Sequence, residues 1–274
     1  MPITLITGCS SGIGLALARA LRVAGHEVWA TARKEQDVAE LQAEGFIAHK
    51  LDVNDELDVL DLFEALFRRG KGLDVLINNA GYGAIGPLLD SSTEQLARQF
   101  NTNVVALVGM TRAFFPLLRL NRGLVVNIGS VSGVLVTPFA GAYCASKAAV
   151  HAISEALRLE LAPFNVRVLE VQPGAIGTHF ADNASLEAEQ AIREGSAWWA
   201  YRENIRARAR ASQNRPTRAE DFAQALVLTL QKPKVPRLVR IGRGSFALPL
   251  LAWLLPKGLL AFVLRRQFGL DRAP

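Results

Sequence analysis

The chain has 274 residues and 50% of them are hydrophobic, which is enough for one large α/β domain with a substantial buried core. Its 31 Lys and Arg residues exceed its 25 Asp and Glu residues, so the formal net charge is +6. This bias suits an anionic cofactor, substrate or membrane surface without selecting among them. Since no recognition motif accompanies the basic charge, we expect no nucleic-acid partner.

The first eleven residues, MPITLITGCSS, lack a basic segment, and their apolar run leads directly into glycine. We therefore expect no secretory signal, and we expect the chain to begin inside the fold. The two cysteines, Cys9 and Cys144, lie far apart in the sequence. They indicate neither a disulfide framework nor a metal cluster, so we expect no metal and a cytoplasmic location.

Short apolar runs alternate with amphipathic stretches along the chain. The runs predict strands at residues 3–7, 26–32, 46–51, 73–78, 123–129, 166–172 and 238–242. Most are apolar enough to be buried on both faces, which is typical of a parallel sheet. Helical periodicity covers residues 12–24, 35–44, 55–69, 94–120, 142–162 and 218–231. We predict an α/β fold, a single-domain doubly wound parallel sheet with helices on both faces.

A glycine-rich run, TGCSSGIG at residues 7–14, follows the first strand and opens the first helix. In that position glycines allow a tight turn and a close approach of the backbone to a pyrophosphate, whose charge the helix N-terminus favours. A tight strand-to-helix turn with no ligand is the alternative. The residues expected at a dinucleotide here are Gly8, Ser10, Ser11, Gly12, Ile13 and Gly14.

Arg33 stands at the end of the second predicted strand, in WATARK. An NAD site places an acidic group near this point for the ribose hydroxyls. An arginine favours the 2′-phosphate of NADP instead, because a guanidinium forms charge-assisted hydrogen bonds with phosphate. The alternative is a solvated arginine at the sheet edge. The sequence therefore favours NADP (NADPH) as the cofactor.

Tyr143 and Lys147 are four residues apart on a predicted helix and therefore share one face. By spacing alone they predict a surface pair. A phenol beside an ammonium group is also a combination suited to proton transfer, because a positive charge about 4 Å away lowers a phenol pKa of about 10 toward neutrality. Both readings remain open at this point.

Seven motifs together resemble the short-chain dehydrogenase/reductase family in order and spacing, over roughly residues 1–180. They are TGCSSGIG at 7–14, Asp52 in LDV, NNAG at 78–81, Asn103 in NTNVV, Ser130 in NIGSVSG, YCASK at 143–147 and PGAIGT at 173–178. TGCSSGIG combined with WATAR is most similar to the branch of estradiol 17-beta-dehydrogenases, retinol dehydrogenases and acyl-dihydroxyacetone-phosphate reductases. The resemblance implies a Rossmann-like fold and a homodimer or homotetramer formed through the long helices.

The resemblance also implies catalytic roles. Tyr143 would be the general acid/base, and Lys147 would lower its pKa and bind the nicotinamide ribose. Ser130 would hydrogen-bond the substrate oxygen as charge develops there. Asn103 would hold a water linked to the lysine and complete a proton relay.

Further cofactor contacts follow by position in the family motifs. Asp52 and Val53 would meet the adenine. The cofactor floor and the loop beside the nicotinamide would be formed by Asn79, Ala80, Gly81, Pro173, Gly174 and Thr178.

Residues 179–215 correspond to the variable substrate lid of the family. Aromatic rings there suit a lipophilic ligand, although core packing is an equally good use. A group of arginines in the same stretch suits an anionic head group or membrane phosphates, with a solvated helix face as the alternative. The aromatic residues are Trp198, Trp199 and Tyr201, and the arginines are Arg202, Arg206, Arg208 and Arg210.

The chain divides into a catalytic domain at 1–245 and an apolar C-terminal extension at 246–274. The strongly apolar part, residues 246–264, is long enough to reach across a bilayer, but Pro249, Pro256 and Gly258 interrupt it. We expect two short helices that cover the substrate mouth, dock on a partner subunit or lie in a membrane interface. Burial against the chain's own domain is the alternative.

These features predict an oxidoreductase that transfers a hydride between NADP(H) and a lipophilic ketone, aldehyde or alcohol. Steroid, retinoid and lipid-like carbonyls are the expected substrates, and peripheral membrane contact through 246–266 accompanies the cytoplasmic location. The alternative is a catalytically silent protein of the same fold that senses NADP(H) or acts as a scaffold. The intact residues Ser130, Tyr143 and Lys147 argue against that alternative.

Overall fold

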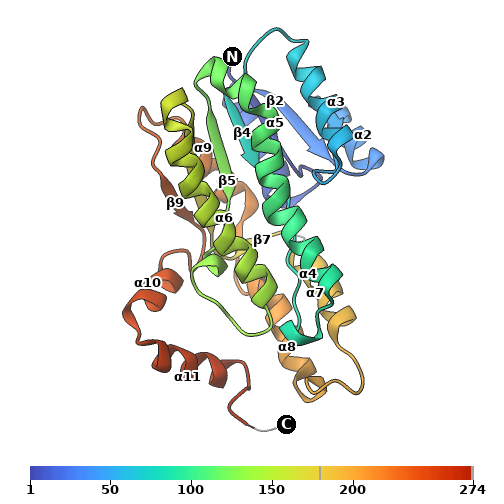
Figure 1. The fold of residues 1–274 in the computed structure, drawn as a ribbon, viewed down its shortest axis with the longest axis vertical. Coiled ribbons are helices and arrows are strands. Elements are labelled where there is room, and N and C mark those ends of the chain that lie inside the picture. Colours follow the sequence, from blue (N-terminus) through green and yellow to red (C-terminus); the bar gives the residue numbers. More distant parts are fainter. Residues whose placement is uncertain (179, 273–274) are drawn as a thin grey trace.

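A seven-stranded parallel sheet forms the centre of the molecule, with the strand order β3-β2-β1-β4-β5-β6-β9 (Figure 1). The computed structural model describes residues 1–178 and 180–272; residue 179 of the expected lid and residues 273–274 of the tail lie outside the described part. The strands are β1 (Ile3–Ile6), β2 (Glu27–Ala32), β3 (Ile47–Lys50), β4 (Val75–Asn78), β5 (Leu124–Ile128), β6 (Arg167–Pro173) and β9 (Leu238–Ile241). All seven predicted strands are confirmed.

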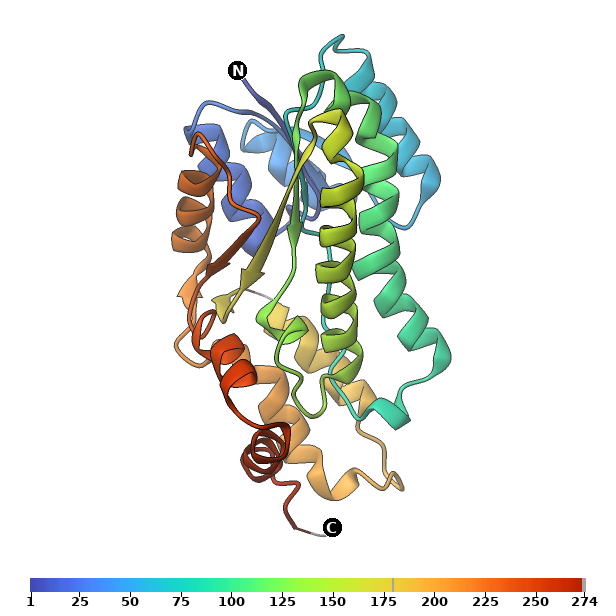
Figure 2. The same cartoon turned by 60° about the vertical axis from the view of Figure 1, so that its left-hand side comes forward.

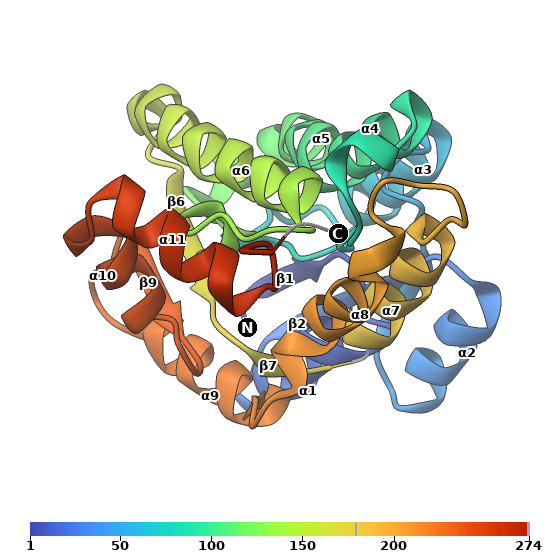
Figure 3. The same ribbon diagram turned by 90° about the horizontal axis from the view of Figure 1, so that it is seen from below.

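Helices cover both faces of this sheet (Figure 3). One layer contains α1 (Gly12–Val23), α2 (Glu35–Ala43) and α9 (Ala219–Leu230), and the other contains α3 (Glu56–Phe67), α5 (Ala106–Asn121) and α6 (Gly141–Glu160). Each layer has its own apolar core: Leu17 and Phe222 are fully buried in the first, and Leu62 and Phe114 in the second. The predicted doubly wound fold is thus confirmed.

The expected helix at 94–120 consists of three pieces. α4 (Thr93–Phe100) begins with a capping box at Ser92, a π-helical turn occupies Asn101–Val105, and α5 continues to Asn121. Such turns are rare and accommodate one extra residue per turn. The run 93–121 is also long and apolar enough to span a membrane, yet half of its most apolar window is buried inside the protein.

Elements at the carboxyl ends of the strands cover one end of the sheet (Figure 2). The lid contains α7 (Phe180–Ala191) and α8 (Arg202–Arg210), and the two-residue strands β7 (Ile176–Gly177) and β8 (Thr217–Arg218) pair at its base. The C-terminal extension forms α10 (Ala247–Leu254) and α11 (Lys257–Gln267), with the break at Leu255 and Pro256. The expectation of two short helices is confirmed.

Candidate active site

The glycine run forms a closely packed turn between β1 and α1. Gly8 has φ +73° and Gly12 has φ +59°, the left-handed region that favours glycine. A Cβ on Gly14 would overlap the carbonyl oxygen of Gly8 and lie 2.6 Å from Nδ2 of Asn79. The turn therefore brings bare backbone to the start of a helix, which is the geometry that a phosphate group requires. Ser10 is exposed on this turn, and Ser11 and Ile13 are half-buried.

The loop after β4 holds the glycine turn in place. Nδ2 of Asn79 donates to the carbonyl oxygens of Thr7 and Gly8, each at 2.9 Å. The backbone N–H groups of Asn79 and Ala80 both donate to Oγ1 of Thr7 at 3.0 Å. Gly81 comes next, and a Cβ there would lie 2.9 Å from Oδ1 of Asn103. Asn79 and Ala80 thus brace the expected cofactor floor, and Thr7 is a member of it that the motif analysis missed.

Arg33 directly follows β2 at the same end of the sheet, and its side chain is exposed. Within residues 1–178 and 180–272 it forms no hydrogen bond or ion pair, so its guanidinium is available to a ligand. Asp52, after β3, has a structural partner: its Oδ1 accepts from the backbone N–H of Asn54 at 3.0 Å. The next residue, Val53, packs against the second core.

On α6, Tyr143, Lys147 and His151 lie one turn apart on the inward face of the helix, where the first two are buried and His151 is partly buried. The exposed fraction is 9% for Tyr143 and 6% for Lys147, so the surface-pair alternative is wrong. Nζ of Lys147 donates to the carbonyl oxygen of Ile128 at 2.8 Å and lies 6.0 Å from the centre of the Tyr143 ring. The pair thus faces the carboxyl end of β5.

Burial dominates the protonation of both groups. It raises the pKa of Tyr143 to about 12, although hydrogen bonding from Ser130 and the charge of Arg208 act in the opposite direction. It also lowers the pKa of Lys147 to about 8. This differs from the expectation that Lys147 brings the phenol toward neutrality, because desolvation disfavours the charged form of each group. Tyr143 is therefore a protonated phenol at neutral pH.

Ser130 follows β5 and is 7% exposed. Its Oγ accepts from the backbone N–H of Ser132 at 3.1 Å, which caps a short 3-10 turn. Its own N–H donates to Nε2 of His151 at 3.4 Å. The Ser130 hydroxyl therefore lies within hydrogen-bonding reach of Tyr143. His151 holds the backbone of Ser130 in this position.

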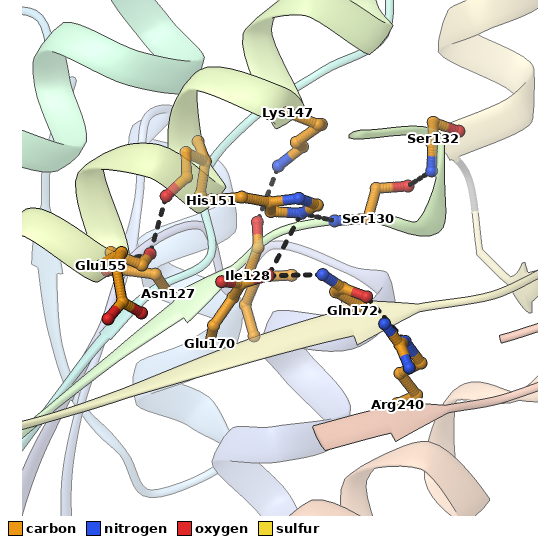
Figure 4. A network of polar contacts seen from close by, with 12 residues as sticks. Asn127, Ile128, Ser130, Ser132, Lys147, His151, Glu155, Glu170, Gln172 and Arg240 are labelled. Atoms are coloured by element: carbon orange, nitrogen blue, oxygen red, sulfur yellow. Dashed lines mark hydrogen bonds and ion pairs between the residues drawn. The ribbon is translucent and has the colours of Figure 1, made fainter. Parts of the chain in front are cut away.

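Figure 4 shows a polar network beside Ser130, in which Glu170 and Gln172 are buried. Nε2 of His151 lies 3.5 Å from Oε1 of Glu170, which accepts from Gln172 at 2.5 Å. Nε of Arg240 donates to Gln172 at 2.8 Å. The network thus links α6 to β6 and β9. Burial, followed by the charges of Lys147 and Arg240, lowers the pKa of His151 to about 4.

Asn103 lies inside the π-helical turn and is 2% exposed. Its Oδ1 accepts from the N–H of Tyr82 at 3.1 Å, while its Nδ2 donates to the carbonyl oxygen of Tyr82 at 3.0 Å and to Oγ of Ser146 at 3.1 Å. The side chain thus ties the loop after Gly81 to α6. A water-mediated link to Lys147 stays a prediction.

The remaining expected residues border the site from β6 onward. Pro173 ends β6, and the N–H of Gly174 donates to the carbonyl oxygen of Ile241 at 2.9 Å. Thr178 lies against the glycine turn, since a Cβ on Gly12 would approach it to 3.0 Å. The Phe180 ring lies 5.4 Å from that of Tyr143, so the start of the lid covers the phenol.

The lid aromatics divide between packing and the surface. Trp198 and Tyr201 pack with Phe139 in a small apolar core, whereas Trp199 is 37% exposed. Phe268 and Leu270, which follow α11, pack on the same core. The core-packing interpretation is thus confirmed for Trp198 and Tyr201.

Trp198 also faces an apolar cavity of about 320 Å³. Its walls come from the loop after β4, the loop before α6, the lid and the tail: Pro87, Leu88, Leu89, Pro138, Phe139, Trp198 and Leu270. A larger hollow of about 600 Å³ lies at the opposite, amino end of the sheet near Met1, Asp74 and Asn121. Only the smaller one borders the lid, so it is the candidate for a lipophilic group.

The lid arginines differ in their surroundings. Arg206 forms ion pairs of 2.7 Å with Glu189 and with Glu203, and Arg202 lies over the ring of Trp199 at 4.9 Å. Arg210 is exposed. Arg208 alone among the four donates into the body of the protein, to Thr137. Sequence spacing gave no signal for this difference, or for the contribution of His151.

The comparisons with known proteins identify the family of the chain. Residues 2–189 match the model of the short chain dehydrogenase family, so the chain belongs to that family. The NADPH-dependent 1-acyldihydroxyacetone phosphate reductase of Saccharomyces cerevisiae is 32% identical over 98% of this chain and 92% of its own. The 3-ketodihydrosphingosine reductase of Bacteroides thetaiotaomicron is 40% identical over 67% of each chain.

The fold comparison gives the same family. A short-chain dehydrogenase from Streptomyces avermitilis has a crystal structure that superimposes with a TM-score of 0.80 at 30% identity, covering 99% of this chain and 98% of the other. The protein is therefore an oxidoreductase of the short-chain dehydrogenase type.

Proposed function

We propose that this protein is an NADPH-dependent reductase that converts a ketone group of a lipophilic molecule into a secondary alcohol. The observation that carries the proposal is the buried face of α6, where Tyr143 and Lys147 lie beside Ser130 at the carboxyl ends of the strands. A surface pair has no reason to be buried at the cost of both pKa shifts, whereas a proton-transfer site does.

The residues at the glycine turn fit a dinucleotide phosphate. The turn approaches without side chains at Gly8, Gly12 and Gly14, and Arg33 presents an unpaired guanidinium at the end of β2. An arginine there suits the 2′-phosphate of NADP. The name of the yeast relative, an NADPH-dependent reductase, supports the same cofactor. When bound, NADPH supplies the hydride.

Tyr143 acts as the proton donor to the carbonyl oxygen. A phenol with a pKa of about 12 remains protonated throughout the neutral range, which favours reduction over oxidation. The hydroxyl of Ser130 hydrogen-bonds the same oxygen as its charge grows. Lys147 provides positive charge behind the phenol and stabilises the phenolate that forms.

A lipophilic substrate is supported by the apolar cavity beside the lid, whose lining includes Leu88, Phe139 and Trp198. The names of two relatives, a 1-acyldihydroxyacetone phosphate reductase and a 3-ketodihydrosphingosine reductase, refer to an acylated and to a 3-keto lipid-like compound. We therefore favour a ketone attached to an acyl or alkyl chain over a steroid or a retinoid.

The deciding experiment follows the oxidation of NADPH against a panel of hydrophobic ketones and aldehydes, and repeats the panel with NADH. We expect turnover with long-chain ketones, a preference for NADPH, and loss of turnover in Tyr143→Phe. Cofactor binding without turnover on the whole panel would support the silent sensor instead. Undiminished turnover in Tyr143→Phe would refute the assigned proton donor.

We further propose that the tail contacts the surface of a membrane. Its apolar side chains remain outside the core: Phe246 is 69% exposed, Trp253 79% and Phe262 59%. Basic residues border them, and residues 246–267 contain no Asp or Glu. Short helices with apolar side chains, an interfacial tryptophan and flanking positive charge suit the headgroup region of an anionic membrane.

A further inference from the structure

The position of Arg208 separates it from the other arginines of α8. Its Nε–H donates to Oγ1 of Thr137 at 2.9 Å, a contact between residues 71 positions apart in the sequence. Arg206, two positions earlier, points to the lid surface, where Glu189 and Glu203 neutralise it. Arg208 therefore faces the body of the protein while Arg206 faces away.

The neighbours of Arg208 place it at the wall of the candidate active site. Ile205 and Ala209, on the same helix, are 1% and 3% exposed and pack in the apolar core that contains Cys144, the residue after Tyr143. Thr137 belongs to the loop that joins Ser130 to α6. The charge of Arg208 acts on the Tyr143 phenol and lowers its pKa against the larger effect of burial.

The guanidinium of Arg208 is incompletely satisfied. A guanidinium has five N–H donors. In the described part of the chain, the bond to Thr137 is the one hydrogen bond it makes, and no carboxylate lies within ion-pair distance. Burial lowers the pKa of Arg208, and the groups that act to raise it are Cys144 and Tyr143, neither of them a carboxylate. Arg208 is partly buried, and its remaining N–H groups are accessible to a ligand. A cation that has lost part of its hydration without gaining a counter-ion is stabilised by an anionic ligand group.

We propose that Arg208 binds an anionic group of the substrate, a phosphate monoester or a carboxylate, close to the ketone that is reduced. This proposal rests on the reductase function proposed above and specifies its substrate class. The same charge repels an ammonium group, so amino ketones are poor substrates. A planar guanidinium with several free donors suits the two or three oxygens of such an anion.

The lipophilic part of the same substrate has a place beside this anion site. Pro138 and Phe139 directly follow Thr137 in the chain, and both line the apolar cavity of about 320 Å³. The carbonyl oxygen of Phe139 accepts from the N–H of Gly86 at 2.8 Å, which ties this loop to the opposite wall. One short loop therefore connects the anion site with the apolar cavity, an arrangement that fits an amphipathic ketone.

The test uses three ketones with the same acyl chain that carry a phosphate monoester, a carboxylate or an uncharged hydroxyl beside the ketone. The wild-type enzyme should prefer one of the anionic ketones, by kcat/KM, over the neutral one. In Arg208→Gln this preference should fall about 10- to 100-fold, the effect of one lost charge-assisted hydrogen bond. Arg208→Lys should restore part of it. Arg193→Gln, which removes an exposed lid charge, is the matched control and should keep the preference.

A binding measurement separates this proposal from the reductase function. Dodecyl phosphate should bind the wild-type protein more tightly than dodecanol, and Arg208→Gln should remove the difference. If no ketone oxidises NADPH, the reductase proposal fails while this titration still decides on Arg208. Equal binding of both probes, an unchanged preference in Arg208→Gln, or weaker binding of NADPH instead of the anion would each overturn the proposal.

Discussion

The backbone N–H of Ser130 donates to the imidazole Nε2 of His151 at 3.4 Å, so a partly buried histidine one turn beyond Lys147 supports the loop that carries the serine. Burial lowers the pKa of this histidine from its ordinary 6.5 to about 4. A neutral imidazole accepts the N–H, whereas a protonated one loses that lone pair. The contact therefore holds at neutral pH and fails in acid.

This relationship predicts acid sensitivity. Between pH 4 and 6.5 the unfolded chain binds more protons at this site than the folded protein, so the free energy of unfolding rises with pH through that window. On acidification the loss attributable to His151 should approach about 3 kcal/mol. Denaturant titrations at pH 4.5, 5.5 and 7 should show a smaller loss in His151→Gln. If the free energy of unfolding fell equally with pH in both proteins, the acid sensitivity would not come from His151.

Lys147 should make the free energy of unfolding depend on pH in the alkaline range. Its folded pKa of about 8 lies below its ordinary 10.5, so the unfolded chain holds more protons between these values and stability rises with pH across them. Relative to Lys147→Met, the wild-type protein should gain about 3 kcal/mol from pH 8 to 10.5. Comparing the two proteins cancels Cys9, whose raised pKa acts oppositely. A constant difference in unfolding free energy would show that the ammonium is not buried in the fold.

Arg33 should determine the cofactor preference. Arg33→Ser removes the exposed guanidinium after β2, and kcat/KM for NADPH should fall about 10- to 100-fold, the effect of a lost charge-assisted contact. The value for NADH should remain nearly unchanged. The neighbouring exposed residue supplies a control, since Lys34→Ser removes an equal charge. If both variants lose NADPH activity equally, general positive charge rather than Arg33 is responsible.

Gly14→Ala should abolish cofactor binding. The new Cβ overlaps the carbonyl oxygen of Gly8 and crowds Asn79, so the turn must open at the point where phosphate is expected. Gly109→Ala on α5 is the control, because nothing lies within 4 Å of a Cβ there and alanine should add about 1 kcal/mol of stability. Thermal unfolding and NADPH fluorescence titrations of both variants make the comparison. Normal NADPH affinity in Gly14→Ala would refute the proposed phosphate site.

Membrane contact should depend on the exposed apolar side chains of the tail. Sedimentation with vesicles of anionic phospholipid should fall about 10-fold for Trp253→Ser and for Phe262→Ser, since each loses the burial of a large apolar group. Leu57→Ser on α3 is the control, because that leucine is 71% exposed on a helix outside the tail. Equal sedimentation of all variants would exclude the tail as the contact.

The sheet could be predicted from sequence because buried parallel strands appear as continuous apolar runs with a period unlike that of the helices. The residues of the candidate site could be proposed from the sequence because the family motifs place Tyr143, Lys147 and Ser130 at fixed intervals. Their pKa values could not, since these depend on burial in the folded protein: Phe180, from a distant part of the sequence, places its ring 5.4 Å from that of Tyr143.

The orientation of Arg208 in the lid could not be predicted from the sequence either. Arg208 lies two residues from Arg206 in a helix with four arginines. The spacing of Glu203 and Arg206 allows a local ion pair, but it does not predict that Arg208 points inward. Which of the two turns inward depends on how Ile205 and Ala209 pack in the apolar core beneath the lid. The π-helical turn could not be predicted either, since the residue inside it, Asn103, bonds to the distant backbone of Tyr82.

Because of that π-helical turn, the geometry near the site also depends on the number of residues in this helical run. An α-helix advances about 100° per residue, so one residue more or less between Thr93 and Ala106 rotates everything before it relative to α5. Deleting any residue of Asn101–Val105 would swing Gln99 away from the N–H of Ala84, which it now holds at 2.7 Å. In this helical run, substitutions should therefore be tolerated more readily than insertions or deletions.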